Sequence, residues 1–428
     1  MLVRHHRPPE FGCQKKEIPM QKNQIGAVIA IVSTLCGMPG AAPVRAQEAD
    51  RASGAAKQWN QDPEWREAKY GDWGGPGVPV VPGPMDSVLL KDYASKSSLV
   101  EPETLVAKAK YTAIDTHSHV AQKISAKSTT ANTPEEVDAW VKAMDEVGVD
   151  ISVVLTDATG EGFDHLVDLY LRRYPTRFQL YCGLMTADMD RPDYPQRAVA
   201  ELARCYRKGA RGMGEITDKG WGYGFGFNQS PGERLHADDP RLDAVWDKCA
   251  ELKIPVVMHQ GDHPSAWQPL DIYQERSPDF QSFNLYGKDV PTLDGLLAML
   301  TRAVAKHPRT TFVACHLANK GNDLAALGKI LDMYPNLYVD IAARDYEIGR
   351  APRAAARFLT KYQNRVLFGT DMGHNKSMYQ AWWRLLETPD EYMPGRAGWR
   401  YYGLDLPDLV LESLYRGNAR RIMNWERP

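Results

Sequence analysis

The sequence has 428 residues, of which 43% are hydrophobic and 25% are charged, an ordinary composition for a folded globular protein. Its formal net charge is −2 and it contains no long basic run, which argues against nucleic acid and anionic membrane surfaces as partners. The length and the unbroken pattern described below predict one large domain with an N-terminal extension.

The first segment of the chain has the pattern of a secretory signal peptide. From Met20 onward, Lys22 provides a positive flank, residues 25–35 are apolar, and a small-x-small cleavage site ends at Ala46. The apolar run is short for a bilayer span, so cleavage is favoured over a membrane anchor. We therefore expect residues 1–46 to be removed, with Met20 as a candidate start. The mature protein is expected to be periplasmic or secreted, without stable membrane insertion.

The next segment, residues 47–110, lacks helical or strand periodicity and is rich in turn formers, as in GDWGGPGVPVVPGP. We expect an extended arm that packs through Trp73 and nearby apolar residues, and a plain linker is the alternative. Such a segment could not bury a hydrophobic core of its own. The folded domain is therefore predicted over residues 111–428, with a helical segment at its C-terminal end.

From Tyr111 onward, short apolar runs alternate with amphipathic segments. The runs are residues 111–117, 151–158, 178–185, 210–217, 254–260, 310–317, 337–343 and 365–371. Nearly all-apolar strands that alternate with helices are typical of a parallel sheet buried on both faces. Eight such units favour a closed (β/α)8 TIM barrel, of the α/β class, over an open doubly wound sheet. The absence of a G-x-G-x-x-G motif after the first run weakens a dinucleotide-binding fold further.

The connecting segments carry helix and loop signals. The stretch TPEEVDAWVKAMDEVG predicts a helix that begins with a capping box. The connections after the fourth and fifth runs are long and aromatic, and in barrels the loops after the strands build the site. Trp221, Tyr223, Phe225 and Trp267 are therefore expected either to line a substrate pocket or to pack over the barrel. Cys315, like the other cysteines of the domain, is expected to be a small buried apolar residue.

Four histidines and one aspartate stand at the ends of predicted strands. His117 and His119 share a face because they are two residues apart in the first strand. His259, His316 and Asp371 end the fifth, sixth and eighth strands. Because the carboxyl ends of all strands meet at one mouth of a barrel, these side chains are expected to converge there. Imidazole nitrogens with a carboxylate oxygen are typical of catalytic zinc, with manganese or iron as alternatives.

The motifs DTHSHV, PVVMHQGDHPSAW, FVACHLAN and VLFGTDMGH, in this order, resemble the amidohydrolase superfamily. More narrowly, they are similar to the amidohydrolase-related branch that includes aminocarboxymuconate-semialdehyde decarboxylase and γ-resorcylate decarboxylase. The resemblance covers residues 112–375. It implies that His117, His119, His259 and Asp371 hold a divalent metal ion and that His316 is a catalytic group beside it. Members of the family often dimerise, so a homodimer is a possible assembly.

Two further residues are candidates for contact with substrate or with a second metal ion. Binuclear relatives often use a carbamylated lysine on strand 4, whereas the predicted fourth strand here carries Glu215 and no lysine. Glu215 could bridge a second ion, contact substrate, or form a salt bridge with Arg211 or another cation at the barrel mouth, and we favour one ion over two. Arg344, which ends the seventh strand, could clamp a substrate carboxylate or pair with Asp340 or Asp345. Trp267 is the aromatic candidate for substrate contact.

The expected chemistry follows from the metal ion, which lowers the pKa of its water from 15.7 to about 7. With His316 polarising a carbonyl and Asp371 transferring a proton, the site would hydrolyse an amide, ester or lactone of a small organic substrate. Non-oxidative decarboxylation of an aromatic or unsaturated acid is the alternative that the resemblance also supports. The predicted export favours hydrolysis, because an exported enzyme suits the processing of external compounds. The least favoured alternative is a binding protein without activity.

Overall fold

The computed structural model describes residues 83, 87–89, 92, 96–120, 133–224, 234–271, 273–276, 280–281, 283–372, 374–395 and 399–423. The predicted signal peptide, Trp73 and Phe225 lie outside the described residues. The compact unit that contains the strands spans Ser97–Pro428. Of the helices that the structure describes, none has both the length and the apolar character needed to cross a bilayer.

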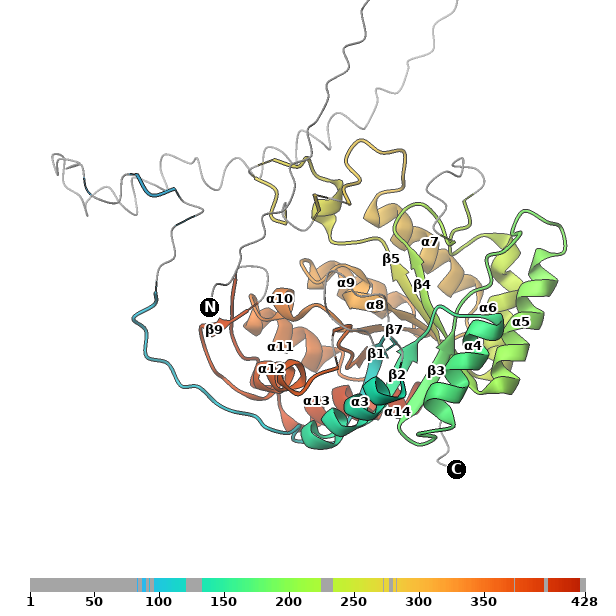
Figure 1. Cartoon of the computed structure of the whole chain (residues 1–428). Helices are drawn as coiled ribbons and strands as arrows, with labels where there is room; N and C mark the ends of the chain where they lie inside the picture. Colours follow the sequence, from blue (N-terminus) through green and yellow to red (C-terminus); the bar gives the residue numbers. More distant parts are fainter. Residues whose placement is uncertain are drawn as a thin grey trace, which may run out of the picture. The chain divides into compact units, whose positions relative to one another are not determined.

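Eight parallel strands form one sheet in which each strand pairs with the next along the chain (Figure 1). The strands are β1 (Ala113–Ser118), β2 (Val149–Leu155), β3 (Phe178–Cys182), β4 (Ala210–Asp218), β5 (Val256–Gln260), β6 (Phe312–Ala314), β7 (Leu337–Asp340) and β8 (Val366–Leu367). The first strand also meets the segment that directly follows β8: Thr116 N donates to Phe368 O at 2.9 Å, and Asp371 N donates to His117 O at 2.8 Å. The predicted α/β fold, a (β/α)8 barrel, is therefore confirmed.

Helices follow the strands and lie outside them (Figure 1). The longer ones are α3 (Pro134–Val147), α4 (Gly160–Leu166), α5 (Tyr194–Lys208), α6 (Asp243–Leu252), α7 (Leu293–Lys306), α9 (Leu324–Met333), α11 (Pro352–Lys361) and α12 (Lys376–Glu387). The predicted capping box is present at α3, because Glu136 N donates to Thr133 Oγ1 at 3.3 Å and Thr133 N donates to Glu136 Oε2 at 3.2 Å. The C-terminal segment forms α13 (Asp408–Glu412), a π-helical turn (Ser413–Gly417) and α14 (Asn418–Ile422).

Two apolar layers hold the barrel together. The larger layer lies between the strands and the helices and includes the buried indoles of Trp140, Trp246 and Trp383. The smaller layer consists of buried residues from six of the strands, from the turn after β6, and from α14 and the residue that follows it: Ile114, Ile151, Val153, Leu155, Tyr181, Val257, Val313, Cys315, Leu367, Ala419 and Met423. Because apolar side chains fill this layer, the polar side chains of the strand ends gather beyond it.

The residues that precede β1 run without helix or strand from 97 to 112 and are tied to the barrel unit by hydrogen bonds. Thr104 donates from both its N and its Oγ1 to the carboxylate of Asp390 at 2.8 Å each. Ala109 N donates to Val147 O, at the end of α3, at 2.9 Å. Residues 97–110, which the sequence assigns to the arm, thus belong to the same compact unit as the strands.

Candidate metal centre

His117 and His119 project from the end of β1 toward Asp371. Asp371 Oδ1 is 3.8 Å from His117 Nε2 and 3.2 Å from His119 Nε2. The Nδ1 atom of each ring is occupied: that of His117 lies 2.9 Å from Asp340 Oδ2, and that of His119 lies 3.2 Å from Leu155 O. Both rings therefore turn Nε2 toward the same space, and the donor atoms of His117, His119 and Asp371 lie within 4.8 Å of one another.

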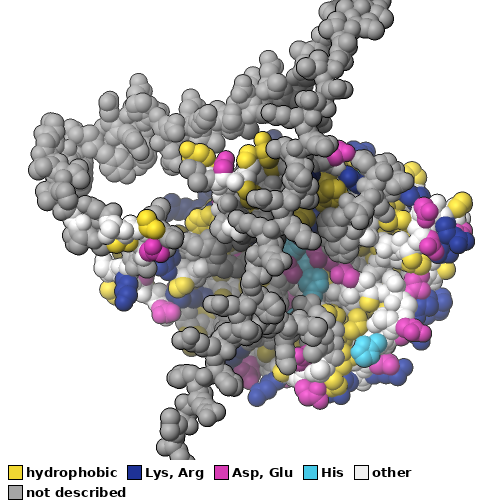
Figure 2. Space-filling view, turned by 45° about the horizontal axis from the view of Figure 1, so that its top comes forward, with side chains coloured by type: hydrophobic (Ala, Val, Ile, Leu, Met, Phe, Trp, Pro, Cys, Tyr) yellow, Lys and Arg dark blue, Asp and Glu magenta, His cyan; other side chains and the backbone are white. Residues whose placement is uncertain are grey.

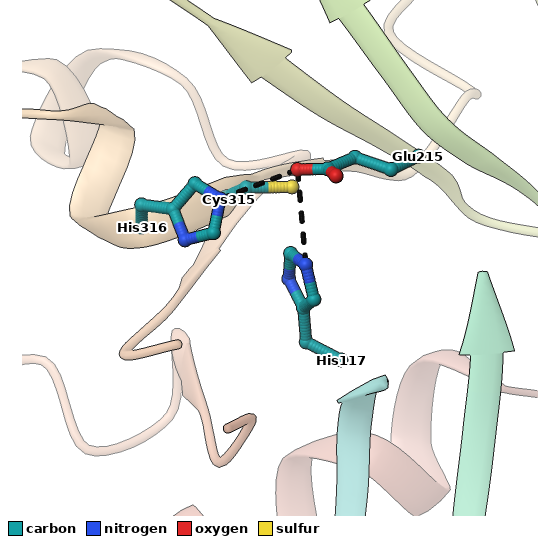
Figure 3. Close-up of side chains that lie close together, drawn as sticks. All are labelled: His117, Glu215, Cys315 and His316. Atoms are coloured by element: carbon teal, nitrogen blue, oxygen red, sulfur yellow. Dashed lines mark hydrogen bonds and ion pairs between the residues drawn. The ribbon is translucent and has the colours of Figure 1, made fainter. Parts of the chain in front are cut away.

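Glu215, on β4, lies among the imidazoles of four histidines, two of which are drawn in Figure 3. Its Oε1 is 2.7 Å from His259 Nδ1 and 3.2 Å from His316 Nε2. The distance from Oε1 to His117 Nε2 is 3.7 Å, and Oε2 is 3.5 Å from His119 Nε2. The carboxylate is only 8% exposed. Glu215 therefore joins His259 and His316 to the pair from β1.

The partner that the sequence suggested for Glu215, Arg211, lies elsewhere. Its guanidinium donates to Ala210 O at 2.9 Å and lies over the ring of Tyr206. Four residues of extended strand span about 13 Å, so Arg211 and Glu215 are too far apart along β4 for an ion pair. The strand contains no lysine, as expected.

His316 reaches the cluster from a left-handed turn and not from a strand end, because β6 stops at Ala314. The φ angles are 59° at His316 and 53° at Asn319, in a run without glycine. Such a conformation costs about 1–2 kcal/mol per residue. Contacts from other segments hold it: His316 N donates to Asp340 Oδ1 at 2.7 Å, and Asn319 Nδ2 donates to Gln260 O at 3.1 Å. The predicted sixth strand, residues 310–317, was therefore too long.

Asp371 likewise follows its strand: β8 ends at Leu367 instead of at residue 371, and Asp371 has a φ of 50°. Its side chain is 29% exposed, more than that of Glu215. Gly369 allows the close approach here, because a Cβ at this position would lie 2.6 Å from the Cβ of His117. The missing side chain thus lets the segment after β8 lie directly against β1 beside the first histidine.

The electrostatics of the cluster favour positive charge at its centre. Burial opposes protonation of His117, but the charges of Asp340 and Glu215 outweigh it and raise the pKa of His117 to about 10. Burial alone would raise the pKa of Glu215, yet His259 and His117 hold it well below its ordinary value. Both Glu215 and Asp371, whose pKa is also lowered, therefore carry negative charge.

Arg344 is buried after β7 and is engaged with protein groups. Its guanidinium donates to the side chain of Asn319, and its Nε lies 3.3 Å from Glu347 Oε2. The ion pair is thus with Glu347, whereas the sequence had suggested Asp340 or Asp345 as partners. These contacts hold the guanidinium over the turn that carries His316.

A cavity of about 220 Å³ lies beside Glu215, and Tyr223 and Asp157 are among its lining residues. Tyr223 is thus one of the predicted aromatic residues that does line a pocket. Trp267 has a different position: its Nε1 donates to Pro291 O at 3.0 Å, and its ring packs in a small apolar cluster of the loop after β5. In the part of the chain that the structure describes, Trp267 does not line this cavity.

Two histidines that were expected to be loop residues have structural contacts. His263 Nδ1 accepts from Ser265 N at 3.3 Å at the start of a short 3-10 helix. His374 stacks on Trp140, with 3.5 Å between ring centroids. Burial lowers the pKa of each of these histidines to about 4.

Sequence reasoning missed two members of the cluster. Cys315 is a buried member of the inner apolar layer, as expected, but its Sγ also lies within 4.8 Å of donor atoms of His117, Glu215 and His316 (Figure 3). Burial raises the pKa of its thiol well above the ordinary value. Asp340 was considered only as a partner for Arg344, because the predicted seventh strand, residues 337–343, placed it inside the strand, whereas β7 ends at Asp340. Histidine and acidic side chains are visible together near the middle of the face in Figure 2.

Comparison with known proteins adds the following. No curated protein matches the chain in sequence. Similar solved structures include an uncharacterized TIM-barrel protein from Bordetella bronchiseptica, with 17% identity, a TM-score of 0.43 and coverage of 68% of this chain and 83% of that one. The 2,6-dihydroxybenzoate decarboxylase from Rhizobium has 17% identity, a TM-score of 0.46 and coverage of 73% and 99%. The 5-carboxyvanillate decarboxylase from Novosphingobium aromaticivorans, complexed with manganese, has 14% identity, a TM-score of 0.47 and coverage of 76% and 100%.

A family model gives the assignment. The model described as amidohydrolase matches residues 114–425, from β1 to the end of the C-terminal helical segment. This range contains every side chain of the cluster described above. It also contains all eight strands, apart from the first residue of β1. The chain is therefore a member of the amidohydrolase family.

Proposed function

We propose that the cluster holds one divalent metal ion through His117, His119, His259 and Asp371, with Glu215 as a further oxygen ligand. Imidazole nitrogens and carboxylate oxygens suit zinc, manganese and iron. The buried Nε2 of His117 has no hydrogen-bond partner among the described residues. An orphaned buried nitrogen that faces two carboxylates is the state expected of a ligand atom without its ion. The observation that carries the proposal is this convergence around Glu215.

The chemistry of the donor atoms supports one ion over two. A second ion would have to draw on Glu215, His316 and Cys315, whose donor atoms also lie close together. Because burial keeps the thiol of Cys315 protonated, it is a poor ligand unless a metal displaces its proton. A titration that yields two ions per chain would replace this reading with a binuclear site.

For the reaction, we propose non-oxidative decarboxylation of a small aromatic or unsaturated carboxylic acid. The motifs that contain His259, His316 and Asp371 are similar to a branch whose named members are decarboxylases. The argument for hydrolysis was the predicted export signal. That signal is in residues 1–46, which lie outside the described residues, so the structure adds no support to it. Metal-dependent hydrolysis of an amide, ester or lactone is the second candidate, because the exposed edge of Asp371 could also accept a proton from water.

The residues of the site divide the work in this proposal. When bound, the metal ion supplies a Lewis acid that polarises a substrate oxygen. The side chain of Asp371 is more exposed than that of Glu215, so Asp371 is placed to exchange a proton with substrate. In decarboxylation one proton is added to the carbon that loses its carboxylate as carbon dioxide, and Asp371 would relay that proton from solvent. His316 Nε2, which the turn after β6 holds at 3.2 Å from Glu215, offers a fixed polar contact.

Product analysis tests the proposal. Protein reconstituted with zinc or manganese is incubated separately with hydroxybenzoates and with lactones, esters and amides. Release of carbon dioxide from a carboxylic acid, abolished in Asp371→Ala and retained in His165→Ala, supports decarboxylation; His165 is an exposed histidine of α4. Release of an acid with an alcohol or amine would replace decarboxylation by hydrolysis. Metal-free protein with undiminished turnover would contradict a metal-dependent enzyme of either kind.

A further inference from the structure

Asp340, the last residue of β7, is buried, and its two carboxylate oxygens have different partners. Oδ2 lies 2.9 Å from His117 Nδ1. Oδ1 accepts from His316 N at 2.7 Å and from Ala342 N at 3.1 Å. We propose that Asp340 is a positioning residue that orients His117 for metal binding and holds the turn that presents His316. This inference rests on the proposed metal site.

The first role follows from hydrogen-bond chemistry at His117. An ionised carboxylate only accepts hydrogen bonds, so the proton of a neutral His117 must reside on Nδ1. The lone pair is then on Nε2, the atom that faces Glu215 and Asp371 at 3.7 and 3.8 Å. A carboxylate that fixes a histidine tautomer from behind is a recurrent support for metal ligands. His117 is fully buried, so water cannot take over this contact.

The second role follows from the backbone at His316. The turn from His316 to Asn319 is left-handed and lacks glycine, so contacts from elsewhere must hold it. Asp340 accepts the backbone N–H of its first residue, and Ala342 O accepts from His316 Nδ1 at 2.8 Å. Both contacts come from β7 or directly after it. The chain at the end of β7 thus determines where the His316 ring lies.

Through these two roles, Asp340 fixes the positions of two imidazoles from distant segments relative to each other. The ring centroids of His117 and His316 are 4.8 Å apart, although one ring belongs to β1 and the other follows β6. Asp340 contacts both residues and, with 1% exposure, has no access to a substrate. Its effect on any reaction must therefore pass through the two histidines.

Substitution of Asp340 by asparagine separates the two roles. The amide oxygen can still accept from the backbone N–H groups of His316 and Ala342, which leaves the NH2 group facing His117 Nδ1. Because that NH2 is a donor, it disfavours the tautomer with a proton on Nδ1 and a free lone pair on Nε2. Asp340→Asn should therefore weaken metal binding about 10- to 100-fold, while backbone hydrogen exchange of residues 315–320 stays close to wild type. Asp340→Ala should weaken metal binding and also accelerate that exchange.

The experiment measures zinc and manganese affinity by competition with a chelator, and amide exchange of residues 315–320 in metal-free protein. Asp332→Asn, an exposed aspartate of α9, is the control. Unchanged metal affinity in Asp340→Asn would overturn the orienting role, and unchanged exchange in Asp340→Ala would overturn the role at His316. If wild-type protein binds neither metal, the proposed function and the orienting role both fall, whereas the exchange measurement still decides the role at His316. Circular dichroism establishes that each variant is folded.

Discussion

Replacing Glu215 with glutamine removes the charge at the centre of the cluster while nearly preserving the shape of the side chain. Imidazole nitrogens of His259 and His117 lie 2.7 and 3.7 Å from Glu215 Oε1. Removing one unit charge at about 4 Å from a cation weakens their attraction by about 4 kcal/mol at an effective dielectric constant of 20. The amide dipole and its easier desolvation recover part of this energy. We therefore expect a net loss of about 3–4 kcal/mol, equivalent to a Kd that is 100- to 1,000-fold higher.

The assay is a calorimetric or chelator-competition titration of metal-free protein with zinc and with manganese, together with elemental analysis of the number of ions per chain. Glu251→Gln is the matched control, because Glu251 is an exposed residue of α6 whose side chain is 67% exposed. A folded Glu215→Gln variant that binds metal within about threefold of wild type, a difference well under 1.4 kcal/mol, would refute the assignment of Glu215 as a ligand. Glu215 would then act only as a hydrogen-bond acceptor for His259.

Three further substitutions test other parts of the molecule. His259→Ala should abolish metal-dependent turnover while His263→Ala retains it, and initial rates with reconstituted protein decide this. Gly369→Ala would place a methyl group 2.6 Å from a buried Cβ of β1, so it should cost about 1–3 kcal/mol in urea unfolding; an unchanged midpoint would contradict the tight packing at this seam. Asp390→Ala removes the acceptor of both Thr104 hydrogen bonds. It should increase proteolysis near residue 104, and an unchanged cleavage rate would count against that anchor. The pKa of Asp390 is lowered in the folded protein despite its burial. Its carboxylate therefore stabilises the folded state at neutral pH. This stabilisation is lost as the pH falls below about 3.9, the pKa of an aspartate in the unfolded chain.

The arrangement of the barrel was predictable because buried parallel strands are nearly all apolar and because every strand end reaches the same mouth. That rule predicted that His117, His119 and His259 would converge, and each has a ring nitrogen within 3.7 Å of Glu215. It failed where geometry depends on contacts between segments. The turn at His316 contains no glycine that would signal a left-handed conformation, and its support from Asp340 comes from a strand 24 residues away.

Partner assignments failed for a related reason. Arg211, a neighbour in sequence, was named as one possible ion-pair partner of Glu215, whereas the contacts of Glu215 lie on other strands and loops. Likewise Asp340 contacts His117, which is 223 residues away in the chain. Periodicity indicates which face of a strand a side chain occupies, but it carries no information about which side chains meet across a barrel. Trp267 shows the same limit, because aromatic composition alone does not distinguish a pocket wall from the packing of a loop.

The hydrogen bonds that join β1 to the segment after β8 have a consequence for biosynthesis. His117 and Asp371, which approach each other across that seam, are separated by nearly the whole domain in sequence. A nascent chain that has left the ribosome only as far as β7 would display its histidines without the aspartate opposite them. With the proposed ligands, the complete set would exist only when translation is almost finished, and a premature stop before the final strand would yield a product without Asp371.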